Sequence, residues 1–466
     1  MNHTASILVS ATDTITNNDK VIKVKRNRDN KEHTKEYITD YYGSFDYDHT
    51  TEKAIPEVDN EKPFYKHIPG TSGLNCSIFF DEKQKSVTRR FGFHRVHYKE
   101  QLSERSNDSC TNVRKRHYFP SKLKISDYER DFPLAYSTMV YTDYYAIELQ
   151  LALSYSPYNE YCYVIDKKAP SYFVEQMNLL GSCFDNVHIA NVDFEIDSNG
   201  KNYAKSHLEC LDILDSKDWK YAFLLQNHDF PLKTNKQLVD ILTLFNGSSD
   251  FQMVPNYLTR IDHHKNWTYE ALNLMQNKSL NTDEDGNLKE LNFVKGFSEL
   301  TISRLDVNYI NDYLNLTTMV EQLNYKRHGI DEMVWGTLLS DENLAFPGGM
   351  PKFCVERGER VEYLTRKSIW RNRRLCKSGM IRHEICIHGV ENLSTIKSYP
   401  HLFLNKLMIT KDAGAMNCWS EMLWKKRYGF EDQSLDMEFY LKTPHVRWRQ
   451  CQNNNDCDPD TFKCSI

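Results

Sequence analysis

Short apolar runs alternate with segments of helical spacing between residues 133 and 245 of the chain. Continuous apolar and aromatic runs, which are typical of buried strands, lie at 133–141, 161–166, 186–190 and 221–226. Segments whose apolar residues recur at the period of a helix lie at 144–154, 171–180, 206–215 and 235–245. Strands that alternate with helices at this distance indicate βαβ units, so we expect a mostly parallel sheet flanked by helices.

Two of the predicted strands end in an acidic residue. Asp166 follows the second strand, and Asp229 follows the fourth. Ligands of parallel sheets bind beyond the carboxyl ends of the strands, so both residues are expected near a ligand. No G-x-G-x-x-G follows the first strand and no G-x-x-x-x-G-K-[ST] occurs, which argues against a dinucleotide enzyme and a P-loop NTPase.

Asp229 lies in the stretch LLQNHDFPLKTN, where it is the only carboxylate. It is a candidate for half of a metal site or for a turn residue, and we favour the turn. Pro231 is then expected to stop the strand, and Thr234 or Asn235 to cap the next helix. The Asp-x-Asp pairs lie in polar, loop-like sequence, and they are Asp46/Asp48, Asp283/Asp285, Asp456/Asp458 and Asp458/Asp460.

The segment DEMVWGTLL has helical spacing and places Glu332, Trp335 and Leu339 along one side. Acidic residues near the start of a helix favour its macrodipole, with Asp331 as a possible cap, and this structural interpretation is the simpler one. In the functional interpretation, Glu332 is a general base beside an aromatic wall.

Basic residues gather in the segment from 382 to 407, where Arg382, His383 and His388 flank a short apolar run and Lys406 follows a second one. Converging basic side chains can hold a diphosphate. The alternative is a solvated surface without a binding role.

The length and charge of the chain restrict its organisation. With 466 residues and a net charge of -5, the sequence gives no electrostatic support for nucleic-acid binding. Residues 1–70 are polar and lack a sustained period, so we expect a flexible stem or tail. A single catalytic domain is expected at 71–430, followed by a cysteine-containing tail at 431–466.

The 12 cysteines are spread along the chain, without a CxxC pair or the spacing of a zinc module. This distribution fits disulfides in an oxidising compartment better than scattered thiols. No apolar run approaches the roughly 20 residues of a membrane span, and the first residues lack the apolar core of a signal peptide. Either the start of the sequence is incomplete or the cysteines are reduced.

Five stretches occur in a fixed order between about residues 133 and 430: YCYVIDKK, GSCFDNVHIA, WKYAFLLQNHDFPLKTN, IDEMVWGTLL, and ICIHGVENL with the later HLFLNK and NCW. Together they resemble the core-2/I-branching β1,6-N-acetylglucosaminyltransferase family, which also includes the peptide O-xylosyltransferases. The resemblance implies a GT-A-like, Rossmann-type domain that transfers a sugar with inversion from a UDP-sugar to a glycan or glycoprotein acceptor. It implies no cofactor and no metal, because basic side chains neutralise the leaving UDP.

The resemblance also assigns the residues that carry the reaction. Glu332 falls on the catalytic carboxylate of the family, and Lys406 falls on one phosphate-binding base. The other phosphate-binding base, an Arg in the branching enzymes, falls on His383, next to Arg382. Because His is only partly charged at neutral pH, we favour Arg382 for this charge, with His383 as the second choice.

Two further residues are assigned a binding role by resemblance. Asp166 corresponds to an Asp that contacts the nucleotide, and Trp370 lies near the position of an aromatic on the acceptor side. The free cysteine that the family carries before its DFP motif is replaced by Gln226.

The resemblance implies the disulfide pairs Cys76–Cys418, Cys110–Cys183, Cys162–Cys210 and Cys376–Cys386. Cys354, Cys451, Cys457 and Cys464 remain, and four cysteines allow three pairings. The family is anchored in the Golgi by an N-terminal membrane helix. The resemblance therefore implies a type II membrane protein of the Golgi lumen. No such anchor is visible in this sequence, and a secreted enzyme is expected if the anchor is genuinely absent.

The leading hypothesis is therefore GlcNAc transfer in β1,6 linkage to an O-glycan core. Xylosyl transfer to protein Ser is the alternative within the family. A secreted glycan-binding pseudoenzyme is the alternative outside catalysis. The loss of the family Arg at His383 supports the pseudoenzyme, whereas the retention of Glu332 and Lys406 argues against it.

Overall fold

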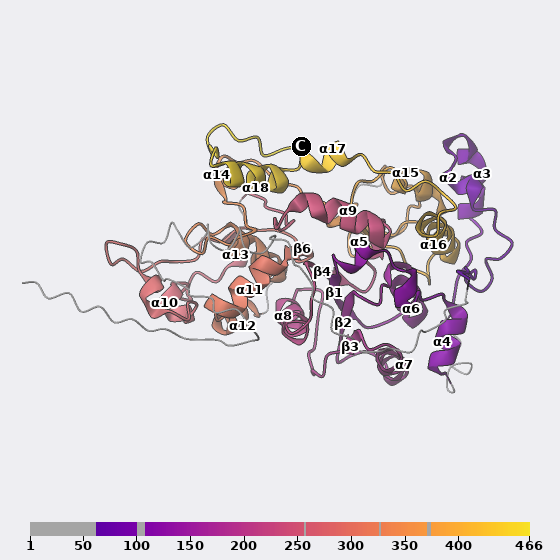
Figure 1. The fold of residues 1–466 in the computed structure, drawn as a ribbon, viewed down its shortest axis with the longest axis horizontal. Coiled ribbons are helices and arrows are strands. Elements are labelled where there is room, and N and C mark those ends of the chain that lie inside the picture. Colours follow the sequence, from indigo (N-terminus) through magenta and orange to yellow (C-terminus); the bar gives the residue numbers. More distant parts are fainter. Residues whose placement is uncertain (1–61, 100–107, 256–257, 326–327, 371–373) are drawn as a thin grey trace, which may run out of the picture. The chain divides into compact units, whose positions relative to one another are not determined.

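The computed structural model describes residues 62–99, 108–255, 258–325, 328–370 and 374–466 (Figure 1). The Asp46/Asp48 pair and most of the predicted stem at 1–70 therefore lie outside the described residues. All elements discussed below belong to one unit, Val58–Ile466.

The centre of this unit is a sheet of five strands in the order β3-β2-β1-β4-β6. The strands are β1 (Leu134–Val140), β2 (Glu160–Ile165), β3 (Val187–Ile189), β4 (Tyr221–Gln226) and β6 (Leu300–Ser303). The first four are parallel, and β6 runs antiparallel to β4. In the register of the sheet, Ser137 lies opposite Cys162 on one side and Leu224 on the other. The α/β fold with a mostly parallel sheet is thus confirmed.

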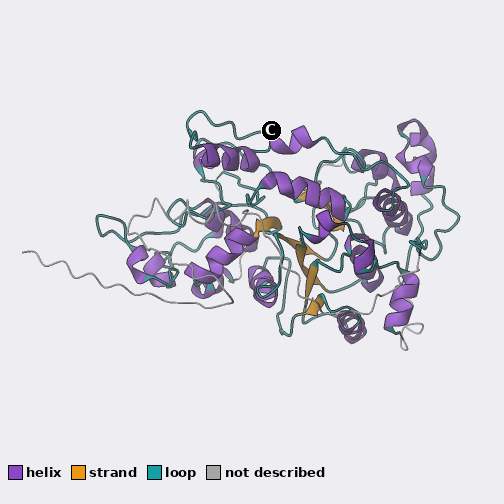
Figure 2. Cartoon of the chain, in the orientation of Figure 1, coloured by secondary structure: helices purple, strands orange, loops and turns teal. Residues whose placement is uncertain are grey.

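Helices cover both faces of this sheet (Figure 2). On β1, Leu134 and Tyr136 pack into one core while Ala135 and Met139 pack into the other, as the alternation of side chains along a strand requires. One core is shared with α6 (Tyr144–Ser154), α7 (Ser171–Ser182) and α9 (Asn235–Phe245). The opposite core is shared with α8 (Tyr203–Ile213), α11 (Arg304–Tyr313), α12 (Thr317–Leu323) and α13 (Trp335–Ser340). Burial on both faces explains why the strands are continuous apolar runs.

After β4, the structure confirms the predicted helix cap but not the predicted role of Pro231. Thr234 caps α9 with a complete capping box, its side chain accepting from Gln237 N. Pro231, however, does not stop β4, which already ends at Gln226. Pro231 itself lies in β5 (Phe230–Pro231), and a strand of two residues is too short for sequence periodicity to reveal.

A second, small sheet brings the C-terminal part of the chain to the end of β4. Its order is β5-β10-β7, with β7 at Arg366–Ser368 and β10 at Phe403–Asn405. The hairpin of β8 (Ile381–Arg382) and β9 (Ile385–Cys386) follows β7 in the chain. Pairing of β10 with β5 therefore places Lys406, the residue after β10, next to the segment that follows β4.

The remaining α-helices are α2 (Ser77–Phe80), α3 (Lys85–Gly92), α4 (Cys110–Arg116), α5 (Asp127–Arg130), α10 (Tyr269–Leu272), α14 (Phe353–Glu356), α15 (Leu393–Ile396), α16 (Ala413–Arg427), α17 (Met437–Leu441) and α18 (Pro444–Asn454). Of these, α17 and α18 pack against α9. Trp448 and Cys464 are buried in the core that α11–α13 share, so the end of the chain is part of the packed unit. Within the described ranges, no helix is long and apolar enough to cross a membrane.

Six disulfides connect the described residues, including the four pairs that the resemblance implies: Cys76–Cys418, Cys110–Cys183, Cys162–Cys210 and Cys376–Cys386. The two pairs that the sequence left open are Cys354–Cys464 and Cys451–Cys457. A disulfide that closes a long loop stabilises the fold mainly by restricting the unfolded chain.

Candidate active site

The carboxyl ends of β1 and β4 are joined by Asn227. Its side-chain oxygen accepts from Tyr141 N at 2.7 Å and from Thr142 N at 3.1 Å, and its amide donates to Thr142 O at 3.1 Å. At the end of β2, Asp166 Oδ1 accepts from Lys168 N at 3.0 Å. These contacts fix the edge of the sheet where parallel α/β folds bind their ligands.

Asp229 is a buried turn residue, as the sequence interpretation expected. Its backbone N donates to Gln226 O at 3.0 Å, and its Oδ2 accepts from Gln226 N at 2.7 Å. Its Oδ1 accepts from Asn405 Nδ2 at 2.7 Å, which ties the residue before Lys406 to the end of β4. The carboxylate thus positions the start of the basic segment.

A buried ion cluster centred on Arg366 lies beneath this edge. Arg366 Nη2 is 2.6 Å from Glu299 Oε2, and its Nη1 is 3.5 Å from Asp229 Oδ1. Tyr203 donates to Glu299 Oε1 at 2.9 Å, and the Gln226 amide donates to the same oxygen. Burial raises the pKa of Glu299, and the Arg366 guanidinium opposes that increase. One guanidinium therefore holds two carboxylates inside the protein.

Lys406 and Arg382 form a cationic pair above this cluster. Lys406 is 8% exposed, and burial, followed by the charges of Arg382 and Arg366, lowers its pKa to about 8. Arg382 is half-buried, and its Nη2 donates to Tyr141 OH at 3.2 Å. Within the residues that the structure describes, neither Lys406 nor Arg382 forms an ion pair with a carboxylate. The pair therefore has charge available for an anionic ligand.

The two histidines of the basic segment differ from this pair. His383 is exposed at the turn of the β8–β9 hairpin with φ 49°, and burial, then Lys406 and Arg382, lower its pKa. It is therefore mostly neutral at neutral pH. His388 is fully buried, and burial lowers its pKa to about 3, so it is a neutral core residue.

Glu332 lies in a 3₁₀ turn, Asp331–Met333, that precedes α13. The predicted continuous helix is wrong here, and because a 3₁₀ turn has three residues per turn, the side chains do not follow α-helical spacing. Trp335 is 1% exposed in the core and forms no wall for Glu332. Asp331 is not the cap, which is Ile330. Asp331 is half-buried against Gly200, and a Cβ added to Gly200 would lie 2.0 Å from Asp331 Oδ1.

Two cations orient the Glu332 carboxylate. Glu332 Oε2 accepts from Arg260 and lies 3.0 Å from Lys295 Nζ, and the side chain is 16% exposed. In the described part of the chain, no group donates to the other oxygen, Oε1. The carboxylate is thus held through one oxygen while the second is available for a substrate hydroxyl.

The approach of the Lys295 segment to Glu332 depends on a glycine. Gly296 N donates to Glu332 O at 2.9 Å. A Cβ on Gly296 would lie 2.1 Å from Gln252 O, which is closer than any real contact. A larger residue would therefore push Lys295 away from the carboxylate.

The aromatic pair of Trp370 and Phe297 lies between Lys295, which contacts Glu332, and the Arg366 cluster. Trp370 is 43% exposed and stacks on Phe297, with ring centroids 6.1 Å apart and an interplanar angle of 7°. Lys295 Nζ lies 5.6 Å from the centroid of the Phe297 ring, and the Arg366 guanidinium lies 5.5 Å from it. Phe297 thus contacts both the partner of Glu332 and the cluster beneath Lys406. Trp370 is thus linked to Glu332 through Phe297 and Lys295.

Sequence reasoning missed five residues of this site: Arg260, Lys295, Phe297, Glu299 and Arg366. Lys295, Phe297 and Glu299 lie at alternate positions of one segment, whereas Arg260 and Arg366 belong to two others, and no spacing links the three segments. The only local signal is an Arg inside the otherwise strand-like run before Trp370. Among the residues that the structure describes, no group of three or more His, Cys, Asp or Glu side chains is arranged to hold a metal ion.

Known proteins similar to this chain share one activity in their names. Beta-1,3-galactosyl-O-glycosyl-glycoprotein beta-1,6-N-acetylglucosaminyltransferase 3 of Rattus norvegicus is 26% identical over 387 residues, which are 78% of this chain and 86% of the relative. The correspondingly named enzyme 4 of Danio rerio is 27% identical over 371 residues, or 76% of this chain and 85% of the relative. A viral relative with the same type of name, from bovine herpesvirus 4 (strain DN-599), is 27% identical over 383 residues and covers 78% and 85%.

Taken with the fold, these similarities define the chain as a glycosyltransferase. Residues 134–397 match the family model described as Core-2/I-Branching enzyme. The chain belongs to that family.

Replacing Arg366 tests whether the buried cluster supports the site. In Arg366→Ala, two buried carboxylates lose their counter-charge, so we expect a loss of about 3–5 kcal/mol in the free energy of unfolding. Chemical denaturation with the disulfides intact measures this loss. The control is Arg360→Ala, an exposed Arg 3.3 Å from Glu362, for which we expect less than about 1 kcal/mol. Equal losses in both variants would show that the cluster has no special role.

Proposed function

We propose that this glycosyltransferase moves N-acetylglucosamine in β1,6 linkage from a UDP-sugar to a glycan acceptor. The observation that carries the proposal is the cationic pair of Lys406 and Arg382 at the ligand-binding edge of the sheet, without a carboxylate partner among the described residues. A diphosphate supplies the missing negative charge. The names of the similar enzymes support the choice of sugar and linkage.

The reaction is a direct displacement at the anomeric carbon. The acceptor oxygen forms the new bond as the bond from the sugar to the UDP oxygen breaks, and UDP leaves with the electron pair. Glu332 Oε1 takes the proton of the acceptor hydroxyl. Arg260 and Lys295 hold Oε2, so the free oxygen is fixed in position before the acceptor binds.

The negative charge that develops on the leaving UDP is stabilised by Lys406 and Arg382. The proposal needs no metal, because the two cations perform its electrostatic role. Arg382 is preferred over His383 for this role, since a guanidinium is charged at all relevant pH values and its Nη2 is oriented by Tyr141. Asp166 is proposed to contact the nucleotide and Trp370 the acceptor.

Two alternative functions use the same fold. Xylosyl transfer to protein Ser would employ the same carboxylate and cations with a different donor pocket. A glycan-binding protein without activity is supported by His383, which is exposed and mostly neutral where the branching enzymes have an Arg. The position of Arg382 beside Lys406 favours the enzyme.

We also propose that the protein works in the Golgi lumen. Six disulfides join the described residues, and such bonds form and persist in the oxidising compartments of the secretory pathway. Attachment to the membrane stays a prediction from the family.

A donor screen tests the proposed function. The purified protein is incubated with UDP-GlcNAc or UDP-xylose and a β1,3-galactosyl O-glycan, with and without EDTA, and the product linkage is determined. We expect GlcNAc transfer that EDTA does not reduce. Absence of transfer and hydrolysis with every UDP-sugar would favour the binding protein, and loss of activity in EDTA would contradict the role of Lys406 and Arg382.

Substitution of the proposed base separates catalysis from donor binding. Glu332→Gln keeps the shape of the side chain but cannot accept the proton, so we expect kcat to fall by about 10²–10⁴-fold. The dissociation constant of UDP, measured by calorimetry, is expected to stay within about twofold, because Glu332 does not contact the phosphates. The exposed Glu342→Gln is the control in the same segment. Wild-type turnover in Glu332→Gln would exclude this residue as the base.

The pKa of Lys406 predicts how UDP binding depends on pH. The free enzyme carries the charged ammonium below pH of about 8 and loses it above that value. Because UDP binds the charged form, its dissociation constant is expected to rise by up to about tenfold per pH unit above this point. Lys406→Arg keeps its charge and should remove the inflection. An inflection that persists in Lys406→Arg would assign the titration to another group.

A further inference from the structure

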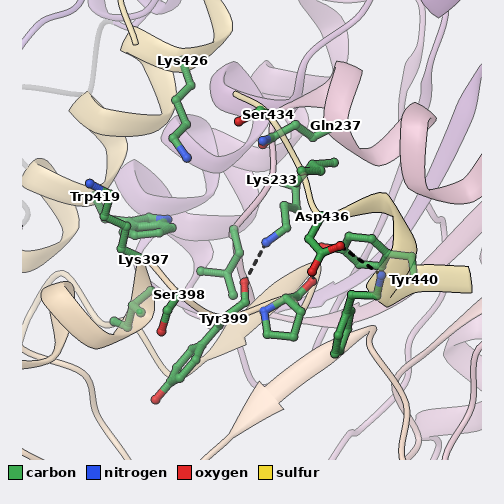
Figure 3. Close-up of a pocket in the computed structure, with 15 residues that line it drawn as sticks. Lys233, Gln237, Lys397, Ser398, Tyr399, Trp419, Lys426, Ser434, Asp436 and Tyr440 are labelled. Atoms are coloured by element: carbon green, nitrogen blue, oxygen red, sulfur yellow. Dashed lines mark hydrogen bonds between the residues drawn. The ribbon is translucent and has the colours of Figure 1, made fainter. Parts of the chain in front are cut away.

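A cavity lies at the end of β10 opposite to Lys406. It has a volume of about 310 Å³ and is lined by the segment that leads into α9, by the segment before β10, by α16, and by residues before and within α17 (Figure 3). Pockets of ~300 Å³ are at the lower end of the size that holds a small ligand. None of the residues assigned to the transfer reaction lines it.

Three lysines line this cavity: Lys233, Lys397 and Lys426. Lys233 is 8% exposed, and its Nζ donates to Tyr399 O at 2.8 Å. Lys426 is half-buried on α16, and its ammonium extends into the same cavity as that of Lys233 (Figure 3). Among the described residues, none of the three lysines forms an ion pair with a carboxylate. The cavity therefore concentrates positive charge without an internal counter-ion.

The nearby carboxylates are occupied elsewhere. Asp436 lines the cavity, but its side chain caps α17 by accepting from Phe439 N at 3.2 Å. Burial lowers the pKa of Lys426, and the charge of Asp432 opposes this, but the Asp432 side chain itself accepts from Ser434 N at 3.0 Å. Glu431, the other acidic residue that acts on Lys426, is exposed and lies outside the cavity lining. The lining itself thus contains three lysines and one carboxylate that already serves as a cap.

Burial makes this arrangement costly for the empty protein. Desolvation, followed by the charge of Lys426, lowers the pKa of Lys233 to about 7. A buried ammonium is stable only when it is paired and hydrogen-bonded, and Lys233 has one backbone acceptor. An anion in the cavity would supply the missing partner.

The apolar part of the lining indicates what accompanies the anion. Tyr399 and Phe439 are half-buried and contribute two rings to the wall. Trp419 also lines the cavity but is only 2% exposed, and its Nε1 donates to Pro231 O at 2.8 Å, so its packed ring closes the wall from behind. Aromatic rings pack against the apolar face of a ring-shaped ligand and leave its polar groups free. The cavity thus combines a cationic end with an aromatic wall.

We propose that this cavity is a second binding site, which takes a small saccharide that carries a phosphate or sulfate ester. The ester group pairs with Lys233, Lys397 and Lys426. The sugar ring packs against Tyr399 and Phe439. The proposal is independent of the donor and acceptor assigned to the transfer reaction.

Calorimetry with N-acetylglucosamine 6-sulfate and N-acetylglucosamine 6-phosphate tests the proposal, with N-acetylglucosamine as the uncharged control. We expect saturable binding of one equivalent of at least one ester and weaker binding of the uncharged sugar. The ester that binds more tightly identifies the anion. Absence of saturable binding by both esters would overturn the proposal.

Variants place the bound ester in the cavity. In Lys397→Gln/Lys426→Gln, the loss of two charged donors should weaken binding by about tenfold or more. The matched control is Lys425→Gln, which removes a neighbouring lysine of α16 that pairs with Glu421 outside the cavity, and it should bind like the wild type. Both substituted side chains of the double variant are partly or fully exposed, so the fold is expected to persist, and a thermal unfolding curve verifies this.

The active site is the competing anion site, and Lys406→Ala distinguishes the two. The proposal expects unchanged ester binding in Lys406→Ala. Binding that is lost in Lys406→Ala but retained in the double variant would assign the ester to the active site and overturn the proposal.

Discussion

The site depends on the buried ion pairs that the Arg366 guanidinium forms with Asp229 and Glu299. Arg366 lies on β7, Asp229 precedes β5, and Glu299 precedes β6, so the cluster joins three segments that are far apart in the sequence. Removing water from three charged groups is expensive, and the mutual attraction offsets that cost only when the geometry is good. The chain therefore has to bring these segments together in one arrangement, and that arrangement also sets the position of Lys406 through the Asn405–Asp229 hydrogen bond.

The same cluster moderates the charge of Lys406. Asp229 and Glu299 raise the pKa of Lys406, whereas burial, Arg382 and Arg366 lower it. Without the two carboxylates, a partly buried ammonium beside two guanidinium groups would lose its proton more readily. The buried carboxylates thus favour the protonated form of Lys406 at neutral pH.

The parallel sheet could be predicted from sequence because each strand is buried on both faces and each helix is long enough to show its period. The predictions for 144–154 and 235–245 agree with α6 and α9 residue for residue. The small sheet and the segment before α13 consist of strands of two or three residues and a 3₁₀ turn, in which periodicity has too few residues to act on. For this reason β5 at Pro231 and the 3₁₀ turn before Trp335 are not evident from the sequence. Residues of the site that interact across long separations, such as Arg260 with Glu332, leave no local pattern at all.

The geometry of the β8–β9 hairpin determines which of its basic residues reaches the edge of the main sheet. The β8–β9 hairpin turns through two residues of positive φ, His383 and Glu384, so Arg382 is the last residue of β8 and lies on the side of the sheet edge. Its guanidinium reaches Tyr141 at the end of β1, the same edge to which Asn227 ties β4. A charge supplied from position 382 thus enters the site from a fixed strand rather than from the exposed turn. His383 lies in the exposed turn, whereas Arg382 is the basic residue of the hairpin that contacts the edge of the sheet.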